Sequence, residues 1–136
     1  ASEASLLPIR ATGSPARASY LRWLFFVAGP VEAVINAKSE GWLKTQTPQQ
    51  ALSAGFGRFE DVVAALRQAV AGKQFVCGDH FTAADLLLAS YIGWAMMENQ
   101  FPKLPEFEAY ANPLLQRAAS VRADQMDGPM QEMLTA

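Results

Sequence analysis

The chain has 136 residues, of which 51% are hydrophobic and 18% are charged, and its net charge is −2 at pH 7. This length suits one domain with a substantial core, and the hydrophobic content excludes a disordered polypeptide. The sequence contains no basic stripe, so we expect neither nucleic acid nor an anionic membrane among its partners. A single cysteine cannot form an internal disulfide and suits a reducing compartment, so we expect a cytoplasmic protein.

The two ends of the chain differ from its middle. Pro8 and Gly13 interrupt any regular pattern, and residues 1–13 are interpreted as a lead-in without a signal core. Residues 14–123 are interpreted as the domain, and residues 124–136 as a tail that Gly128 and Pro129 break. The chain opens with alanine, which fits either removal of the initiator methionine or a natural protein that begins upstream.

The first helix is predicted to begin at Ser14 and Pro15, since serine caps helices and proline suits their first position. Gly29 and Pro30 should kink it, and it should end near Gly41.

A second cap and proline, Thr47 and Pro48, precede the clearest helical stripe in the chain. Gly55 and Gly57 lie inside that stripe, so either the helix begins near Arg58 or the glycines let another helix approach closely. We favour the close approach. The stripe consists of Leu52, Phe56, Phe59, Val63, Leu66 and Val70.

The central helix should run from residue 83 to about residue 98, and it is apolar on every side. Thr82 and Asp85 are spaced as a capping box, with Asp85 in the usual place of Glu or Gln. Asp85 is therefore interpreted as a structural cap rather than a catalytic carboxylate. The longest run without charges, residues 86–97, is too short to cross a bilayer and predicts a buried helix.

The remaining sequence predicts a short helix over residues 106–111 and another from Asn112 and Pro113 through Val121. No segment of useful length alternates with a period of two. The predicted fold is all-α, a bundle of about five or six helices.

Few residues suggest chemistry. Cys77 and His80 could form a nucleophile pair, but a small buried thiol in a connector, with a solvated histidine before the cap, is the better interpretation. One histidine without a second Cys/His cluster predicts no metal site. Large aromatic side chains near the Gly-Pro pair could line an apolar pocket, although core packing must account for most of them. The residues alone specify a soluble helical domain without a complete active site.

Residues 78–85, GDHFTAAD, followed by a leucine-rich run, resemble the helix-start motif of the C-terminal all-helical domain of glutathione transferases. This motif marks folding rather than catalysis. The resemblance extends over residues 14–120. Residues 17–26 are similar to the first long helix of bacterial members, and residues 75–78 to bacterial, beta-like sequences. Residues 101–104 and 113–118 resemble the closing helices of the domain.

The resemblance implies a parent enzyme that conjugates glutathione to a hydrophobic electrophile and is a cytoplasmic homodimer active in detoxification. Glutathione would be the co-substrate, and no metal would be required. A thioredoxin-like N-terminal domain would bind most of the glutathione, and residues 1–13 are too few to form that domain. That domain carries the activating residue of the family, so we expect the isolated chain to be inactive and assign it no catalytic residue. The residues implied to contact the electrophile are Phe26, Gly29, Glu32, Trp94 and Met130.

Two functions follow from these observations. The chain is either the electrophile-site and dimer-contact domain of a glutathione transferase, or a non-catalytic protein–protein interaction module of the same fold. We favour the transferase because the resemblance continues through both apolar helices, although a shared fold alone does not establish a function.

Overall fold

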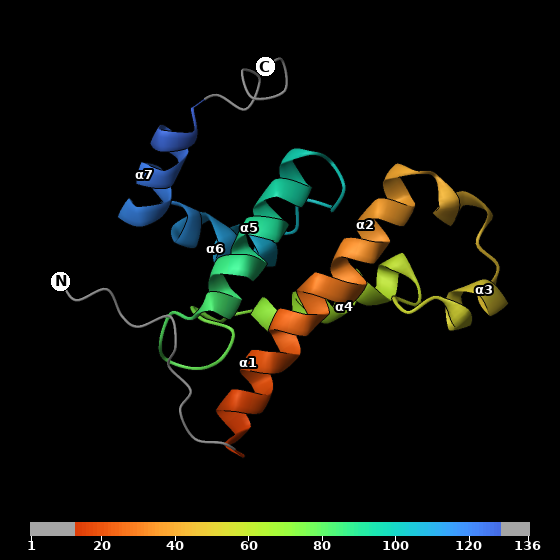
Figure 1. Ribbon diagram of the computed structural model, residues 1–136, viewed down its shortest axis with the longest axis horizontal. Helices are drawn as coiled ribbons and strands as arrows, with labels where there is room; N and C mark the ends of the chain where they lie inside the picture. Colours follow the sequence, from red (N-terminus) through yellow and green to blue (C-terminus); the bar gives the residue numbers. More distant parts are fainter. Residues whose placement is uncertain (1–12, 129–136) are drawn as a thin grey trace.

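A computed structural model describes residues 13–128, and every regular element in that range is helical (Figure 1). Because α1, η1 and α2 form one continuous helix of 25 residues, the described chain has six helices and a short 3₁₀ turn, which confirms the predicted all-α bundle. Met130 lies outside the described residues. In chain order, the elements are α1 (Pro15–Phe26), η1 (Val27–Val31), α2 (Glu32–Ser39), η2 (Trp42–Thr45), α3 (Pro48–Ser53), α4 (Phe59–Val70), α5 (Ala83–Met97), α6 (Pro105–Leu115) and α7 (Ala118–Asp127).

The first helix begins where its sequence predicts, with the backbone N–H of Arg17 donating to Ser14 Oγ at 3.2 Å. The feature predicted as a kink is a π turn, η1, which contains Pro30. Proline lacks the N–H of a regular helical turn, and the wider turn lets the backbone continue into α2. Figure 1 shows α1 and α2 as one uninterrupted rod.

Within the described range, this helix is long and apolar enough to cross a membrane by length and composition alone. The core helix of a soluble protein can pass the same test. Here Val27, Val31 and Val34 are fully buried against the rest of the bundle. One side of the helix therefore belongs to the core.

The glycine-containing segment differs from the favoured interpretation. α3 ends at Ser53, and α4 begins at Phe59 after Arg58 as its N-cap, so the alternative interpretation is correct. Gly57 has a φ of +73°, and a Cβ atom at either glycine would meet nothing within 4 Å. The favoured close approach is wrong, because these glycines form a turn between two helices. Leu52 is consequently 82% exposed.

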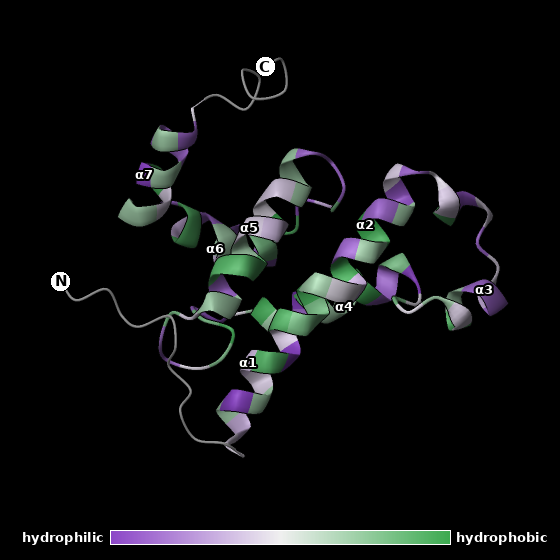
Figure 2. Cartoon of the chain, viewed as in Figure 1, coloured by the Kyte–Doolittle hydropathy of each residue, from purple (hydrophilic) through white to green (hydrophobic). Residues whose placement is uncertain are grey.

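The central helix is confirmed, and α5 packs against both α1 and α6. Figure 2 shows hydrophobic residues along α1 and α5. Burial of these side chains provides the main driving force for folding. The largest fully buried apolar side chains are Leu66, Leu88, Ile92, Phe107, Val27, Val31, Val34 and Val70.

The helix after α5 also differs from its prediction. α6 runs without interruption from Pro105 to Leu115 with Pro113 inside it, whereas the sequence predicted a break at Asn112. Proline in a helix leaves the carbonyl four residues earlier without its donor. That residue, Ala109, is exposed, so its carbonyl can be solvated, while Tyr110 and Leu114 are buried in the core. The break follows Leu115, and α7 then extends to Asp127.

The close approach of helices occurs at Gly93 in α5, where a Cβ atom would lie 2.5 Å from Cδ1 of Leu115 in α6. We expect Gly93→Val to lower the free energy of unfolding by about 1–3 kcal/mol, because the added side chain overlaps that leucine. The measurement is urea denaturation, repeated in a Leu115→Ala background. A Gly93→Val cost that is not smaller in that background would contradict the close-approach explanation.

Candidate functional site

The Asp85 carboxylate is the most connected polar group in the described chain, and its residue is 0% exposed. Thr82 and Asp85 form the predicted capping box at the start of α5. The backbone N–H and the hydroxyl of Thr82 each donate to Asp85 Oδ2 at 2.8 Å. The other oxygen, Oδ1, accepts from the Val76 N–H and from the Tyr110 hydroxyl, both at 2.7 Å.

This arrangement confirms the structural interpretation of Asp85. Four hydrogen bonds occupy the carboxylate, and they join the loop before α5, the α5 N-terminus and α6. Burial and the neighbouring Asp85 charge raise the pKa of Tyr110 well above its usual range, so its phenol remains a donor. A fully buried and fully paired carboxylate has no access to a substrate.

The Cys77 and His80 pair also has the structural character that we favoured. Burial raises the pKa of the half-buried Cys77 thiol. Hydrogen bonding with Ser19 lowers this pKa and the nearby Asp85 charge raises it, and the net pKa is raised. A raised thiol pKa leaves little nucleophilic thiolate at neutral pH. His80 is exposed. Among the described residues, no group of three or more His, Cys, Asp or Glu side chains could hold a metal.

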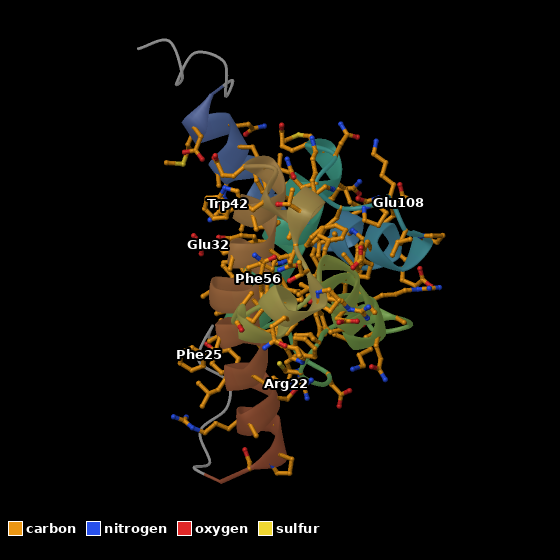
Figure 3. All side chains as sticks on the ribbon, turned by 90° about the vertical axis from the view of Figure 1, so that its right-hand side faces the viewer. Arg22, Phe25, Glu32, Trp42, Phe56 and Glu108 are labelled. Atoms are coloured by element: carbon orange, nitrogen blue, oxygen red, sulfur yellow. The ribbon has the colours of Figure 1, made fainter. Side chains whose placement is uncertain are left out.

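A groove of about 350 Å³ lies between α2 and α5 and is the best candidate for a binding site. It brings together two of the predicted residues, Glu32 from α2 and Trp94 from α5. In Figure 3, Glu32 projects from the same side of the first helix as Phe25. The residues that line the groove are Glu32, Ile35, Asn36, Ser90, Tyr91 and Trp94.

Glu32 and Tyr91 interact across this groove. Burial raises the pKa of Tyr91, and the Glu32 charge and hydrogen bonding to Glu32 raise it further. The Tyr91 phenol is therefore protonated at neutral pH and can donate to the carboxylate. The groove thus combines an apolar wall, which Ile35 and Trp94 provide, with a negative polar end.

Lys38 ties the two helices together beyond the groove. Its Nζ donates to the Asn99 carbonyl at 3.2 Å and to the Gln100 carbonyl, just past the C-terminus of α5. The same ammonium lies 4.7 Å from the centroid of the Phe59 ring. A cation suits this end of a helix dipole, so Lys38 helps to hold α2 beside α5.

The other predicted contact residues lie outside this groove. Phe26 is half-buried and packs edge-on against Trp23, with ring centroids 5.6 Å apart. Gly29 is exposed within the π turn, with open space where a side chain would be. Sequence reasoning missed Ile35, Asn36, Ser90 and Tyr91. Helical spacing from Glu32 and Trp94 could have found all four, because residues three or four apart share a face.

Comparison with known proteins identifies the class of this helical domain. The family model described as "Glutathione S-transferase, C-terminal domain" matches residues 49–123. Neither the search of curated proteins nor the search of solved structures gave a significant match. The matched segment covers more than half of the chain and includes α4, α5 and α6. The chain belongs to the glutathione S-transferase C-terminal domain family.

Proposed function

We propose that this chain is the electrophile-binding domain of a glutathione S-transferase. The observation that carries the proposal is the groove between α2 and α5, which combines the exposed ring of Trp94 with Ile35 and a few polar groups in a chain of this family. Such a mixture of apolar wall and sparse polar groups is typical of small-molecule sites.

In this proposal, the chemistry is divided between two domains. A thioredoxin-like domain binds glutathione and activates its thiol, while the groove holds an apolar electrophile near the attacking sulfur. Holding two reactants together replaces a bimolecular encounter and lowers the entropic cost of reaction. No residue of the groove is assigned a catalytic role.

Exposed apolar side chains on α1 and α5 favour covering of these helices by another domain or subunit. Phe25 in α1 is 72% exposed, and Leu86 and Met97 in the adjacent α5 are 45% and 56% exposed. Large apolar side chains are costly to leave in water when they gather on one surface. We propose that the glutathione-binding domain and a second copy of the protein contact these helices in a cytoplasmic homodimer.

The test measures glutathione conjugation to 1-chloro-2,4-dinitrobenzene by a two-domain protein that carries this chain after a glutathione-binding domain. Trp94→Ala should raise the KM for the electrophile about fivefold to tenfold, because the groove loses its aromatic wall. The chain alone should show no conjugation. The control is Trp42→Ala, which removes the same side chain from a site outside the groove, where Trp42 is 65% exposed. Equal effects of the two variants would contradict the proposal.

The second candidate is a non-catalytic interaction module of the same fold. The observation that favours it is the structural use of Asp85 and Cys77, which leaves the described residues without an activated nucleophile. Absence of conjugation in the two-domain protein, together with unchanged folding, would favour this candidate.

A further inference from the structure

The groove between α2 and α5 has an uneven charge. Among the described residues that line it, only Glu32 is charged, and this residue is exposed on the first turn of α2. The other polar side chains in the lining are neutral. A ligand in this groove therefore meets one negative group at the edge of an apolar wall.

Among the residues that the structure describes, no ion pair involves Glu32. The two ion pairs found between residues 13 and 128 join Arg58 to Asp61 and Arg67 to Glu106, and both lie away from the groove. Lys38, on the same helix, is engaged by the carbonyls beyond α5. Within the described part of the chain, the neutral Tyr91 phenol is the group that interacts with Glu32.

The phenol of Tyr91 leaves acceptor positions of the carboxylate available, because a carboxylate can accept about four hydrogen bonds. Trp94, which is 40% exposed, presents an indole ring in the same groove. An ammonium group pairs favourably with both features, with a carboxylate through charge-assisted hydrogen bonds and with an indole through its ring face.

We infer that the groove selects apolar molecules that carry a protonated amine. The amine would lie between Glu32 and Trp94, and the apolar part would lie against Trp94 and Ile35. This inference rests on the proposed function, because it specifies which electrophiles the same groove would accept. It places Glu32 as a specificity-determining residue rather than a catalytic one.

The test compares three naphthalene probes of similar size by isothermal titration calorimetry on the full 136-residue chain. These are 1-naphthylmethylamine, which is protonated at pH 7, the neutral 1-naphthylmethanol, and the anionic 1-naphthoate. We expect the amine to bind about three- to tenfold more tightly than the alcohol, and the carboxylate to bind least. Raising the salt concentration to 0.5 M should reduce the preference for the amine.

Glu32→Gln should bring the ratio of amine to alcohol affinity close to one, chiefly because binding of the amine becomes weaker. The matched control is Glu40→Gln, which removes the same charge from an exposed residue just after α2 and outside the groove. Binding of the alcohol without preference for the amine would overturn this inference and leave the proposed function standing. Failure of all three probes to bind would overturn both. A preference that persists in Glu32→Gln would overturn the assignment of Glu32.

Discussion

Replacing Asp85 by alanine should lower the free energy of unfolding by about 3–5 kcal/mol. The carboxylate is completely buried and accepts four hydrogen bonds. Alanine would leave the N–H groups of Val76 and Thr82 and the hydroxyl of Tyr110 without their acceptor. Each buried donor left unpaired costs about 1–3 kcal/mol, and relaxation of the loop recovers part of the sum.

The measurement is the denaturant midpoint, with an unchanged slope required for comparison of the variants. Asp61→Ala is the matched control, because Asp61 also lies in the first turn of a helix but pairs with Arg58 on the surface. It should cost less than about 1 kcal/mol. Equal midpoints for Asp85→Ala and Asp61→Ala would refute the role of the buried carboxylate.

Phe107→Ala should also destabilise the domain by about 3–5 kcal/mol. Phe107 in α6 is 0% exposed and its ring lies against Phe101, with centroids 6.1 Å apart. Truncation removes apolar contacts and leaves a cavity that a close-packed core fills only partly.

The matched control is Phe25→Ala, which deletes the same atoms from a side chain that is 72% exposed. We expect a change within about 0.5 kcal/mol for this variant. Thermal or urea unfolding of both variants measures the contrast. A Phe25→Ala variant as unstable as Phe107→Ala would show that burial does not explain the difference.

Local signals in the sequence predicted several helix starts. Ser14, Thr47 and Thr82 each precede a helix that begins at the next residue. Helix caps can be predicted from the sequence because the two hydrogen-bonding partners of a cap lie within a few residues of each other. The predicted helix break at Asn112 was wrong, because it depended on a local signal alone. Burial of Tyr110 and Leu114 in the core outweighs the local effect of Pro113.

The candidate site was harder to predict from the sequence than the helix starts, because it depends on contacts between residues that are distant in the chain. The capping box of Asp85 was evident, whereas its bonds to Val76 and Tyr110 depend on how the loop and α6 fold back. Glu32 and Trp94 were expected from a family resemblance, and Tyr91 can be placed only by its spacing from Trp94, once Trp94 is known to face the groove. A helix that is apolar on every side has no periodicity to show which residues face a groove.

The π turn in the first helix determines the angular position of the groove residues. Trp23, Val27, Val31 and Ile35 are all buried, although they follow one another in steps of four. In a regular α-helix of 3.6 residues per turn, three such steps would rotate the last residue about 120° away from the first. The wider turn absorbs much of this rotation, so the inward side stays aligned along the rod. Deleting one residue from η1 would rotate Glu32 by about 100° relative to α1. The number of residues in this single turn thus determines which side chains of α2 face a ligand in the groove.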